Sequence, residues 1–235
     1  MSILAIDTSN ETLGVAIHDG AKTIAAYIAN SKTKHSKRLM PVINQLMQDA
    51  NMTPQDLTRI VVAKGPGSYT GVRIGLSTAK MMAWTLQIPV IGISSLETLA
   101  LHAITQPELI CPFFDARRGL VYTGLYQRSD AHQAKLIKDE QNVLMEDWLY
   151  ELRELNQSIL FLSPDLALYR DLIQSILGEK AIFPMEPFHH PSPALLAVAG
   201  SERAEDPVHQ LTPNYLRLVE AEAKWLAKQK EHSNE

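Results

Sequence analysis

A carboxylate stands where an apolar run near the amino terminus gives way to a polar turn. The run covers residues 3–6, and Asp7 follows it, ahead of Thr8, Ser9 and Asn10. In open α/β sheets an acid at such a strand end commonly faces a ligand crevice, and successive backbone amides can cradle an anion. An Asp in a turn also stabilises the turn by bonding its own backbone. The residues alone leave two interpretations open, an anion-binding loop and a structural turn.

The most unusual segment is the glycine-rich stretch GPGSYTGVRIG at residues 65–75. It is not a Walker loop, because no Gly-Lys-Ser/Thr follows at the required spacing. It is not a dinucleotide fingerprint either, because the third glycine, Gly71, comes one residue too late after Gly67. The two leading glycines instead predict a tight backbone path. Ser68 or Thr70 can then cap the helix that we expect over about residues 70–86.

Small residues recur at every fourth position inside this predicted helix, at Gly71, Gly75, Ala79 and Ala83. Two interior glycines cost roughly 1 kcal/mol each relative to alanine, so a packing gain should offset them. A bare ridge lets another helix approach to the usual separation of about 8–10 Å or closer. A partner's helix is our preferred occupant, and packing within the chain is the alternative. The other sides are also apolar and need cover: Val72, Ile74, Leu76, Met81, Met82 and Trp84.

Several residues that suggest catalysis lack the neighbours that catalysis needs. His35 has Leu39 at position i+4, so a two-histidine helical metal site is missing. His189 and His190 are adjacent, a spacing at which two imidazoles rarely bind one metal. Cys111 lies in an apolar run, where buried packing is the expected role. The spacing assembles no Ser/His/Asp set, and we expect no catalytic residue, no metal and no cofactor.

Two basic groups offer contacts to anions. Arg117 and Arg118 follow Asp115 closely, and an ion pair with that carboxylate is preferred over a contact with an external anion. A second group lies before and within a helix predicted over residues 36–51, and its simplest interpretation is a solvated face. Its members are Lys32, Lys34, His35, Lys37 and Arg38.

The charge balance limits the class of partner. The 235 residues include 22 Lys+Arg and 26 Asp+Glu, a net charge of −4, which argues against a strongly basic nucleic-acid binder. It does not exclude a subunit whose partner holds the nucleic acid. No apolar run approaches the roughly 18 residues of a membrane span, so we expect no membrane contact. The amino terminus lacks the basic region of a signal peptide, which favours a cytoplasmic location.

The elements that position these residues fall into two similar halves. A period-two apolar pattern predicts a three-stranded meander over residues 3–28, and helices and strands alternate from there to about residue 100. Pro107 marks a candidate boundary. Beyond it the opening pattern returns, as an apolar run, Asp115, a polar turn and an alternating strand from Val121. Later elements are expected at about residues 146–154 (helix), 159–162 (strand), 164–177 (helix) and 193–203 (helix).

Seven segments taken together are similar to one known family. They are ILAIDTS with GVAI, HSKRLMPVI, GPGSYTGVRIGLSTAK, PVIGISSLETLA, FDARRGLVY and PNYLR. The chain resembles the TsaB family, also called YeaZ, over essentially its whole length. The resemblance implies an α/β, two-lobed actin/Hsp70-like (ASKHA) fold, each lobe a mixed sheet with flanking helices and the second lobe reduced. It implies an N-terminal lobe at 1–104 with the interaction helix, and a smaller C-terminal lobe at 105–235 whose last helix, about 218–230, could pack back on the first.

The resemblance also implies a function. It implies a non-catalytic scaffold and activating subunit for N6-threonylcarbamoyladenosine (t6A) modification of tRNA at the adenosine beside the anticodon. A TsaD-like catalytic subunit is the implied partner, a TsaE-like ATPase joins them, and tRNA is held mainly by the complex. Alone, two copies could pair through the same helix. Asp7, Thr8 and Ser9 would form a vestigial phosphate loop. The expected partner interface is Gly71, Arg73, Gly75, Leu76, Thr78, Ala79, Met82 and Ala83.

A stand-alone ATPase or a glycoprotease-type metallopeptidase is the alternative. The His-x-x-x-His motif of TsaD-like proteins is absent, since Leu39 stands four residues after His35. Folds of this type usually supply a second Asp-Gly phosphate loop and a Gly-Gly nucleotide contact. Here Asp115 is followed by Ala116, and the sequence contains no Gly-Gly pair. These departures disfavour an independent enzyme.

Overall fold

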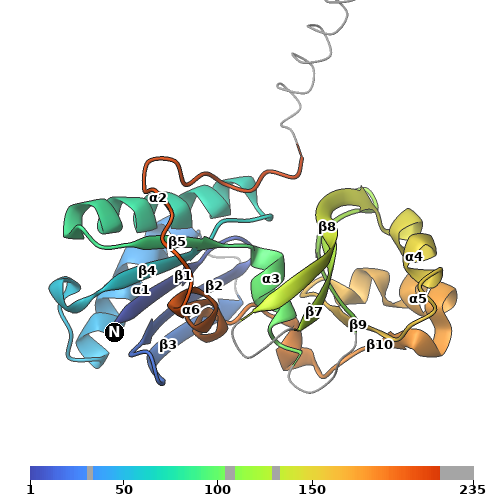
Figure 1. Ribbon diagram of the computed structural model, residues 1–235, viewed down its shortest axis with the longest axis horizontal. Coiled ribbons are helices and arrows are strands. Elements are labelled where there is room, and N and C mark those ends of the chain that lie inside the picture. Colours follow the sequence, from blue (N-terminus) through green and yellow to red (C-terminus); the bar gives the residue numbers. More distant parts are fainter. Residues whose placement is uncertain (31–33, 104–108, 129–132, 218–235) are drawn as a thin grey trace, which may run out of the picture.

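Two lobes lie side by side in the computed structural model, which describes residues 1–30, 34–103, 109–128 and 133–217 (Figure 1). Each lobe is built around a five-stranded sheet with flanking helices. The expected α/β architecture of two lobes, each a mixed sheet with flanking helices, is therefore confirmed. Lys32, Pro107 and the helix predicted at about 218–230 lie outside the described residues.

The first sheet has the strand order β3-β2-β1-β4-β5. β1, β2 and β3 form the predicted antiparallel meander, whereas β1, β4 and β5 run parallel. Alternate residues of β1 enter different cores, with Leu4 and Ile6 on one side of the sheet and Ile3 and Ala5 on the other. The strands are β1 (Ile3–Asp7), β2 (Thr12–His18), β3 (Thr23–Asn30), β4 (Arg59–Ala63) and β5 (Val90–Ile93).

Two long helices cover one face of this sheet, α1 (His35–Asp49) and α2 (Tyr69–Leu86). Both begin and end within two residues of the predicted bounds. The buried residues of α1 include Leu39, Ile43 and Leu46, a spacing of four and three that places them on one helical face. The Ser68 hydroxyl oxygen accepts a hydrogen bond from the Gly71 amide at 3.2 Å, which confirms Ser68 as the cap of α2.

The second sheet repeats the topology of the first, with the order β8-β7-β6-β9-β10. Helices α4 (Met145–Arg153) and α5 (Leu166–Leu177) cover one of its faces through a core that includes Trp148 and Ile173. The weak repeat seen in the sequence is thus a repeat of topology. The strands are β6 (Leu109–Asp115), β7 (Leu120–Arg128), β8 (Ala134–Leu144), β9 (Ile159–Leu162) and β10 (Ala181–Ile182). Short 3-10 helices among the described residues are Pro54–Asp56, Gly178–Lys180 and Glu186–His189.

Each lobe sends its last helix to the sheet of the other lobe. Helix α3 (Ser95–Ala100) follows β5 but packs on β6 and β7, and α6 (Pro193–Ser201) follows β10 but packs on the first sheet. The Arg59 guanidinium at the start of β4 donates to the carbonyl oxygen of Gly200 at 2.7 Å, which fixes the end of α6. A boundary at residue 104 therefore does not separate the lobes in space, because α6 returns to the first.

The chain beyond α6 forms an irregular strap, residues 206–217, across the first lobe (Figure 1). Asp206 bridges to Val90 at the edge of β5, and the Lys80 ammonium on α2 donates to the Leu211 carbonyl oxygen at 2.7 Å. The Asn214 amide then donates to the Lys64 carbonyl oxygen at 2.7 Å. This C-terminal strap brings residues 215–217 to the cleft between the lobes.

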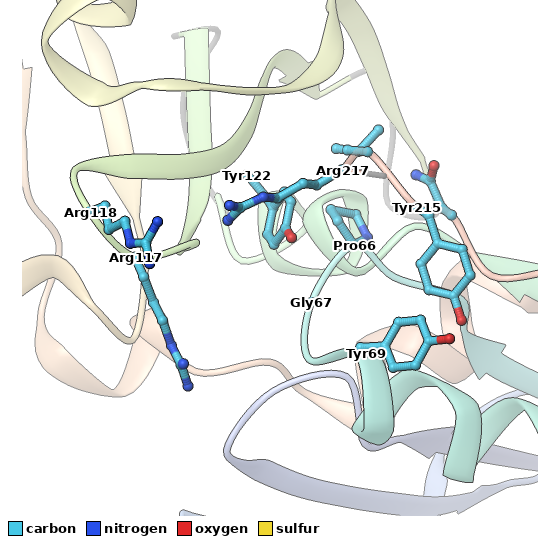
Figure 2. Close-up of a pocket in the computed structure, with 10 residues that line it drawn as sticks. Pro66, Gly67, Tyr69, Arg117, Arg118, Tyr122, Tyr215 and Arg217 are labelled. Carbon is cyan, nitrogen blue, oxygen red and sulfur yellow. The ribbon is translucent and has the colours of Figure 1, made fainter. Parts of the chain in front are cut away.

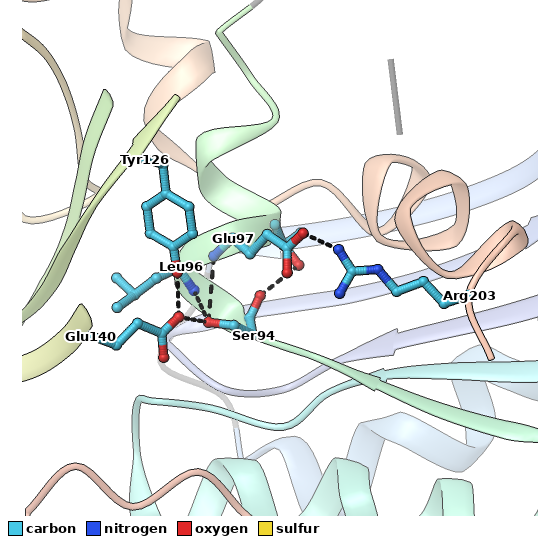
Figure 3. A network of polar contacts seen from close by, with 7 residues as sticks. Ser94, Leu96, Glu97, Tyr126, Glu140 and Arg203 are labelled. Atoms are coloured by element: carbon cyan, nitrogen blue, oxygen red, sulfur yellow. Dashed lines mark hydrogen bonds and ion pairs between the residues drawn. The ribbon is translucent and has the colours of Figure 1, made fainter. Parts of the chain in front are cut away.

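A polar network joins the two lobes beside the strap (Figure 3). Glu140 on β8 accepts hydrogen bonds from the Ser94 and Tyr126 hydroxyl groups. Its other carboxylate oxygen accepts from the side-chain amide of Asn214 at 2.6 Å. Arg203 forms an ion pair with Glu97 of α3, whose pKa is nevertheless raised by burial. Groups from both sheets and the strap therefore hold one another in place.

The glycine ridge of α2 faces inward, which corrects our preferred interpretation of it. A Cβ atom on Gly71 would lie 2.2 Å from the Thr8 carbonyl oxygen, and one on Gly75 would lie 2.5 Å from the Thr8 hydroxyl oxygen. That hydroxyl donates to the Gly71 carbonyl oxygen at 2.7 Å. The glycines thus allow α2 to approach the end of β1 in the same chain, and the alternative of internal packing holds.

Gly75→Leu is expected to destabilise the fold, because even the first added carbon collides with Thr8. Overpacking a core typically costs about 1–3 kcal/mol. Ser77→Leu adds the same side chain on the exposed side of α2 and should change the free energy of unfolding by less than about 0.5 kcal/mol. Urea denaturation of both variants measures the difference. Equal stability of the two would contradict this packing.

Candidate functional site

The turn after β1 is closed by its own side chains. One carboxylate oxygen of Asp7 accepts from the Ser9 amide at 2.8 Å and from the Ser9 hydroxyl at 2.7 Å. Asp7, Thr8 and Ser9 are all buried, and the Ser9 carbonyl oxygen accepts from the Ser68 amide at 2.7 Å. This geometry favours the structural-turn interpretation of the sequence, because the Ser9 amide is already bonded and is not free for an anion.

The carboxyl group of Asp7 is nevertheless only partly satisfied, and its pKa is shifted. Its second carboxylate oxygen is buried and has no hydrogen-bond partner among the described residues. Burial raises the pKa of Asp7, an effect that the bonds from Ser9 and the nearby His35 only partly oppose. Ionisation of this carboxyl group is therefore less favourable in the folded chain than in the unfolded chain.

A cavity of about 680 Å³ lies between the two lobes. Asn10 and Glu11 line it from the first lobe, and Asp115 and Asp165 line it from the second. Asp115 occupies the position in β6 that Asp7 has in β1. One of its carboxylate oxygens accepts from the Tyr169 hydroxyl at 2.6 Å and from the Arg117 amide at 3.1 Å. Both strand-end acids are thus engaged by local donors.

A second cavity, of about 360 Å³, opens beside the first and gathers arginine and tyrosine side chains (Figure 2). Arg217 of the strap points across it toward Arg118, and Tyr69 and Tyr215 lie side by side at its edge. We name it the arginine pocket. Its lining residues are Pro66, Gly67, Tyr69, Arg117, Arg118, Tyr122, Asn214, Tyr215, Leu216 and Arg217.

The structure does not support the ion pair that we preferred for Arg117 and Arg118. Arg117 contacts Asp115 through its backbone amide, and the ion pairs formed by described residues join other groups. Both arginine side chains are exposed and line the pocket instead. The sequence showed that they were adjacent to an acid, but not that both side chains line a pocket.

The predicted interface residues divide between the two sides of α2. Arg73 is exposed and Thr78 and Met82 are partly exposed. The buried members pack inside the chain and cannot touch a partner as the sequence suggested: Gly71, Gly75, Leu76, Ala79 and Ala83. We expected Met81 and Trp84 to be covered by other apolar groups, yet they are 63% and 56% exposed. Arg73, Ser77, Met81 and Trp84 make up what we call the α2 outer face.

The remaining candidate residues have structural surroundings. Cys111 is buried, and its thiol contacts the Trp148 indole nitrogen at 3.3 Å. Burial raises the pKa of this thiol to about 11, which disfavours the nucleophilic thiolate. Among the described residues, no three His, Cys, Asp or Glu side chains are grouped as metal binding requires. No helix in the described part of the chain has the length and apolar character of a membrane span.

Asp7→Asn is expected to flatten the dependence of stability on pH. A raised pKa in the folded state means that stability falls as pH rises from the ordinary Asp pKa, about 4, through the raised value. Asparagine carries no charge, so the variant should lose this decline and gain stability relative to wild type at pH 7–8.

Urea denaturation at several pH values between 4 and 8 measures the Asp7→Asn effect. Asp19→Asn is the matched control, because the backbone amides of Lys22 and Ala21 lower the pKa of this exposed carboxylate. Its substitution should act in the opposite direction. If the free energy of unfolding depended on pH in the same way for wild type and Asp7→Asn, the pKa of Asp7 would not be raised by folding.

Comparison with known proteins agrees with the architecture. The family described as TsaD, tRNA N6-adenosine threonylcarbamoyltransferase, matches residues 22–225. The chain is 51% identical over 230 residues to the tRNA threonylcarbamoyladenosine biosynthesis protein TsaB of Bacillus subtilis (strain 168), covering 98% of this chain and 100% of the relative. It is 35% identical over 133 residues to TsaB of Escherichia coli (strain K12), covering 55% of this chain and 57% of that one.

A solved structure matches the fold as a whole. It is YeaZ from Pseudomonas aeruginosa, with a TM-score of 0.74, 25% sequence identity, and coverage of 92% of this chain and 99% of that one. Both lobes are therefore shared with this structure. Given this fold and a relative more than half identical along nearly the full chain, the protein belongs to the TsaB (YeaZ) family of tRNA threonylcarbamoyladenosine biosynthesis proteins.

Proposed function

We propose that this chain is a non-catalytic subunit that binds and activates a TsaD-like catalytic subunit in t6A modification of tRNA, in the cytoplasm. The observation that carries the proposal is the α2 outer face. Met81 and Trp84 are large, apolar and more than half exposed, and Met40 on the neighbouring α1 is 51% exposed. Large apolar side chains that are exposed on two neighbouring helices indicate a protein-binding surface.

The contact that we propose is helix against helix. α1 and α2 cover the same face of the first sheet, so a partner's helices could lie along both. Arg73, Thr78 and Met82 remain proposed contacts, and Met81 and Trp84 are added to them. Aromatic residues and Met are enriched in the centres of protein interfaces. A second copy of the chain could occupy the same face when the partner is absent.

The site geometry supports a division of labour in which another subunit performs the chemistry. Asp7 is buried and accepts hydrogen bonds from Ser9 of its own turn. Leu39 is buried at the position, four residues after His35, where a second metal-binding histidine would be needed. The TsaE-like ATPase is the proposed source of ATP hydrolysis, and the TsaD-like subunit is the proposed site of transfer. This chain would then act by holding the catalytic subunit in an active form.

Substituting the exposed apolar residues should break pairing and leave the chain folded. Met81→Glu with Trp84→Glu is expected to weaken binding to the TsaD-like subunit by at least about thirtyfold, the range of interface hot spots. Calorimetry measures the affinity. Leu168→Glu on α5 is the matched control, because Leu168 is 69% exposed but lies on the second lobe. Equal affinity of the double variant and the control would place the interface elsewhere.

Reconstituted t6A modification should depend on pairing and not on Asp7. In a mixture with TsaD-like and TsaE-like subunits, omitting this chain or using the Met81/Trp84 double variant should strongly reduce modification, while Asp7→Ala should reduce it less. The purified chain alone should hydrolyse neither ATP nor peptide. Turnover by the chain alone that disappears with chelator would instead identify a stand-alone enzyme.

A further inference from the structure

The arginine pocket concentrates positive charge on a chain that is negative overall. Arg117 and Arg118 come from the β6–β7 hairpin and Arg217 from the C-terminal strap. None of the pocket's lining residues is Asp or Glu. The acidic side chains Glu11, Asp115 and Asp165 line the adjoining cavity between the lobes, which Arg117 and Arg217 also line. An anion is therefore favoured in the arginine pocket, where no carboxylate is among the lining residues.

Aromatic rings stand at the same mouth. The rings of Tyr69 and Tyr215 are stacked with centroids 5.2 Å apart, and both residues are exposed, at 42% and 40%. The Arg73 guanidinium lies 3.9 Å from the centre of the Tyr69 ring and donates to the Tyr215 hydroxyl oxygen at 2.6 Å. The pair is thus fixed in orientation before any ligand arrives.

The hairpin keeps arginines where the backbone disfavours them. Arg117 and Arg118 have φ angles of +69° and +59°, and Gly119 follows at +77°. Side-chain-bearing residues adopt this region at a cost, and glycine adopts it freely. A turn of this shape would be more stable with glycine at either arginine. The stability of the turn therefore does not explain arginine at these two positions, whereas binding an anion would.

We propose that the arginine pocket binds a single-stranded segment of RNA, with Arg117, Arg118 and Arg217 on its phosphates and the Tyr69–Tyr215 pair stacked against a base. Exposed basic groups beside aromatic platforms are the common means of binding single strands. The ligand chemistry is a nucleotide, and the exposed arginines favour a strand passing over the mouth rather than an engulfed free nucleotide. The inference rests on the proposed role in tRNA modification and adds a direct contact between this chain and RNA.

The test is fluorescence anisotropy of a short labelled single-stranded RNA titrated with the full chain at several salt concentrations, alone and in complex with the TsaD-like subunit. Wild type should bind, with affinity that falls as salt rises. Arg118→Gly combined with Arg217→Ser should weaken binding roughly tenfold or more and flatten the log–log salt slope by about 1–1.5. Arg118→Gly alone should not lower stability in urea, because glycine suits the backbone at position 118, whereas Arg217→Ser also removes a donor to the Ala116 carbonyl oxygen.

Matched variants distinguish the contributions of total charge, of the location of the arginines and of the Tyr215 ring to RNA affinity. Arg153→Ala with Arg170→Ala removes the same charge from exposed residues of α4 and α5 and should leave RNA binding within about twofold. Tyr215→Ala should weaken binding roughly fivefold or more, whereas Tyr215→Phe, which keeps the ring, should bind nearly as wild type. This split would show that the ring of Tyr215, and not its hydroxyl group, contributes to binding.

Competition identifies the source of the nucleotide. AMP and inorganic phosphate should displace the RNA only weakly, because each offers at most one base and one phosphate. AMP that competes as strongly as RNA would overturn the assignment in favour of a free nucleotide. RNA binding that is absent in wild type, or unchanged in the double arginine variant, both alone and in complex, would also overturn it. Pairing and reconstituted modification are measured separately, so the proposed function could stand while this inference fails.

Discussion

The close approach of α2 to the end of β1 is the constraint on which the rest of the structure depends. Gly71 and Gly75 leave room for Thr8, and the Thr8 hydroxyl bonds back to the Gly71 carbonyl oxygen. This contact fixes both the height and the rotation of α2 on the sheet. Fixed in this way, the helix buries its small residues, presents Met81 and Trp84 outward, and delivers Tyr69 from its first turn to the cleft between the lobes.

A second constraint is the exchange of helices between the lobes. Each sheet buries one face under helices of its own half and the other under a helix from the opposite half, α6 or α3. Because α6 returns to the first sheet, the chain that follows it must run along the first lobe, which is how the strap reaches β5, α2 and finally the β6–β7 hairpin. Neither lobe can be separated from the other without exposing apolar surface.

The sequence predicted what depends on local pattern and missed what depends on distant neighbours. The meander, α1, α2 and the repeat around Asp7 and Asp115 followed from apolar period and turn residues. β8 was missed because its residues are largely polar and only partly buried. The small residues on one face of α2 were predicted correctly, but the surface that packs on them was not. A four-residue repeat shows which residues share a helical face, but it does not show which element packs against that face. The strap has no period at all, so the contact between Arg73 and Tyr215 could not be foreseen.

The net charge of the chain does not describe the local charge in the arginine pocket. A total of −4 describes the field far from the molecule, whereas a bound phosphate responds to the groups within a few ångströms of it. Arg118 and Arg217 are ninety-nine positions apart in the sequence, and only the folded strap places them in one pocket. Arg73 then links that pocket to the α2 outer face, because it lies on the exposed side of the helix and holds the tyrosine pair. A partner seated on α2 would therefore contact the residue that orients the stacking platform, and the two surfaces would be coupled through a single guanidinium.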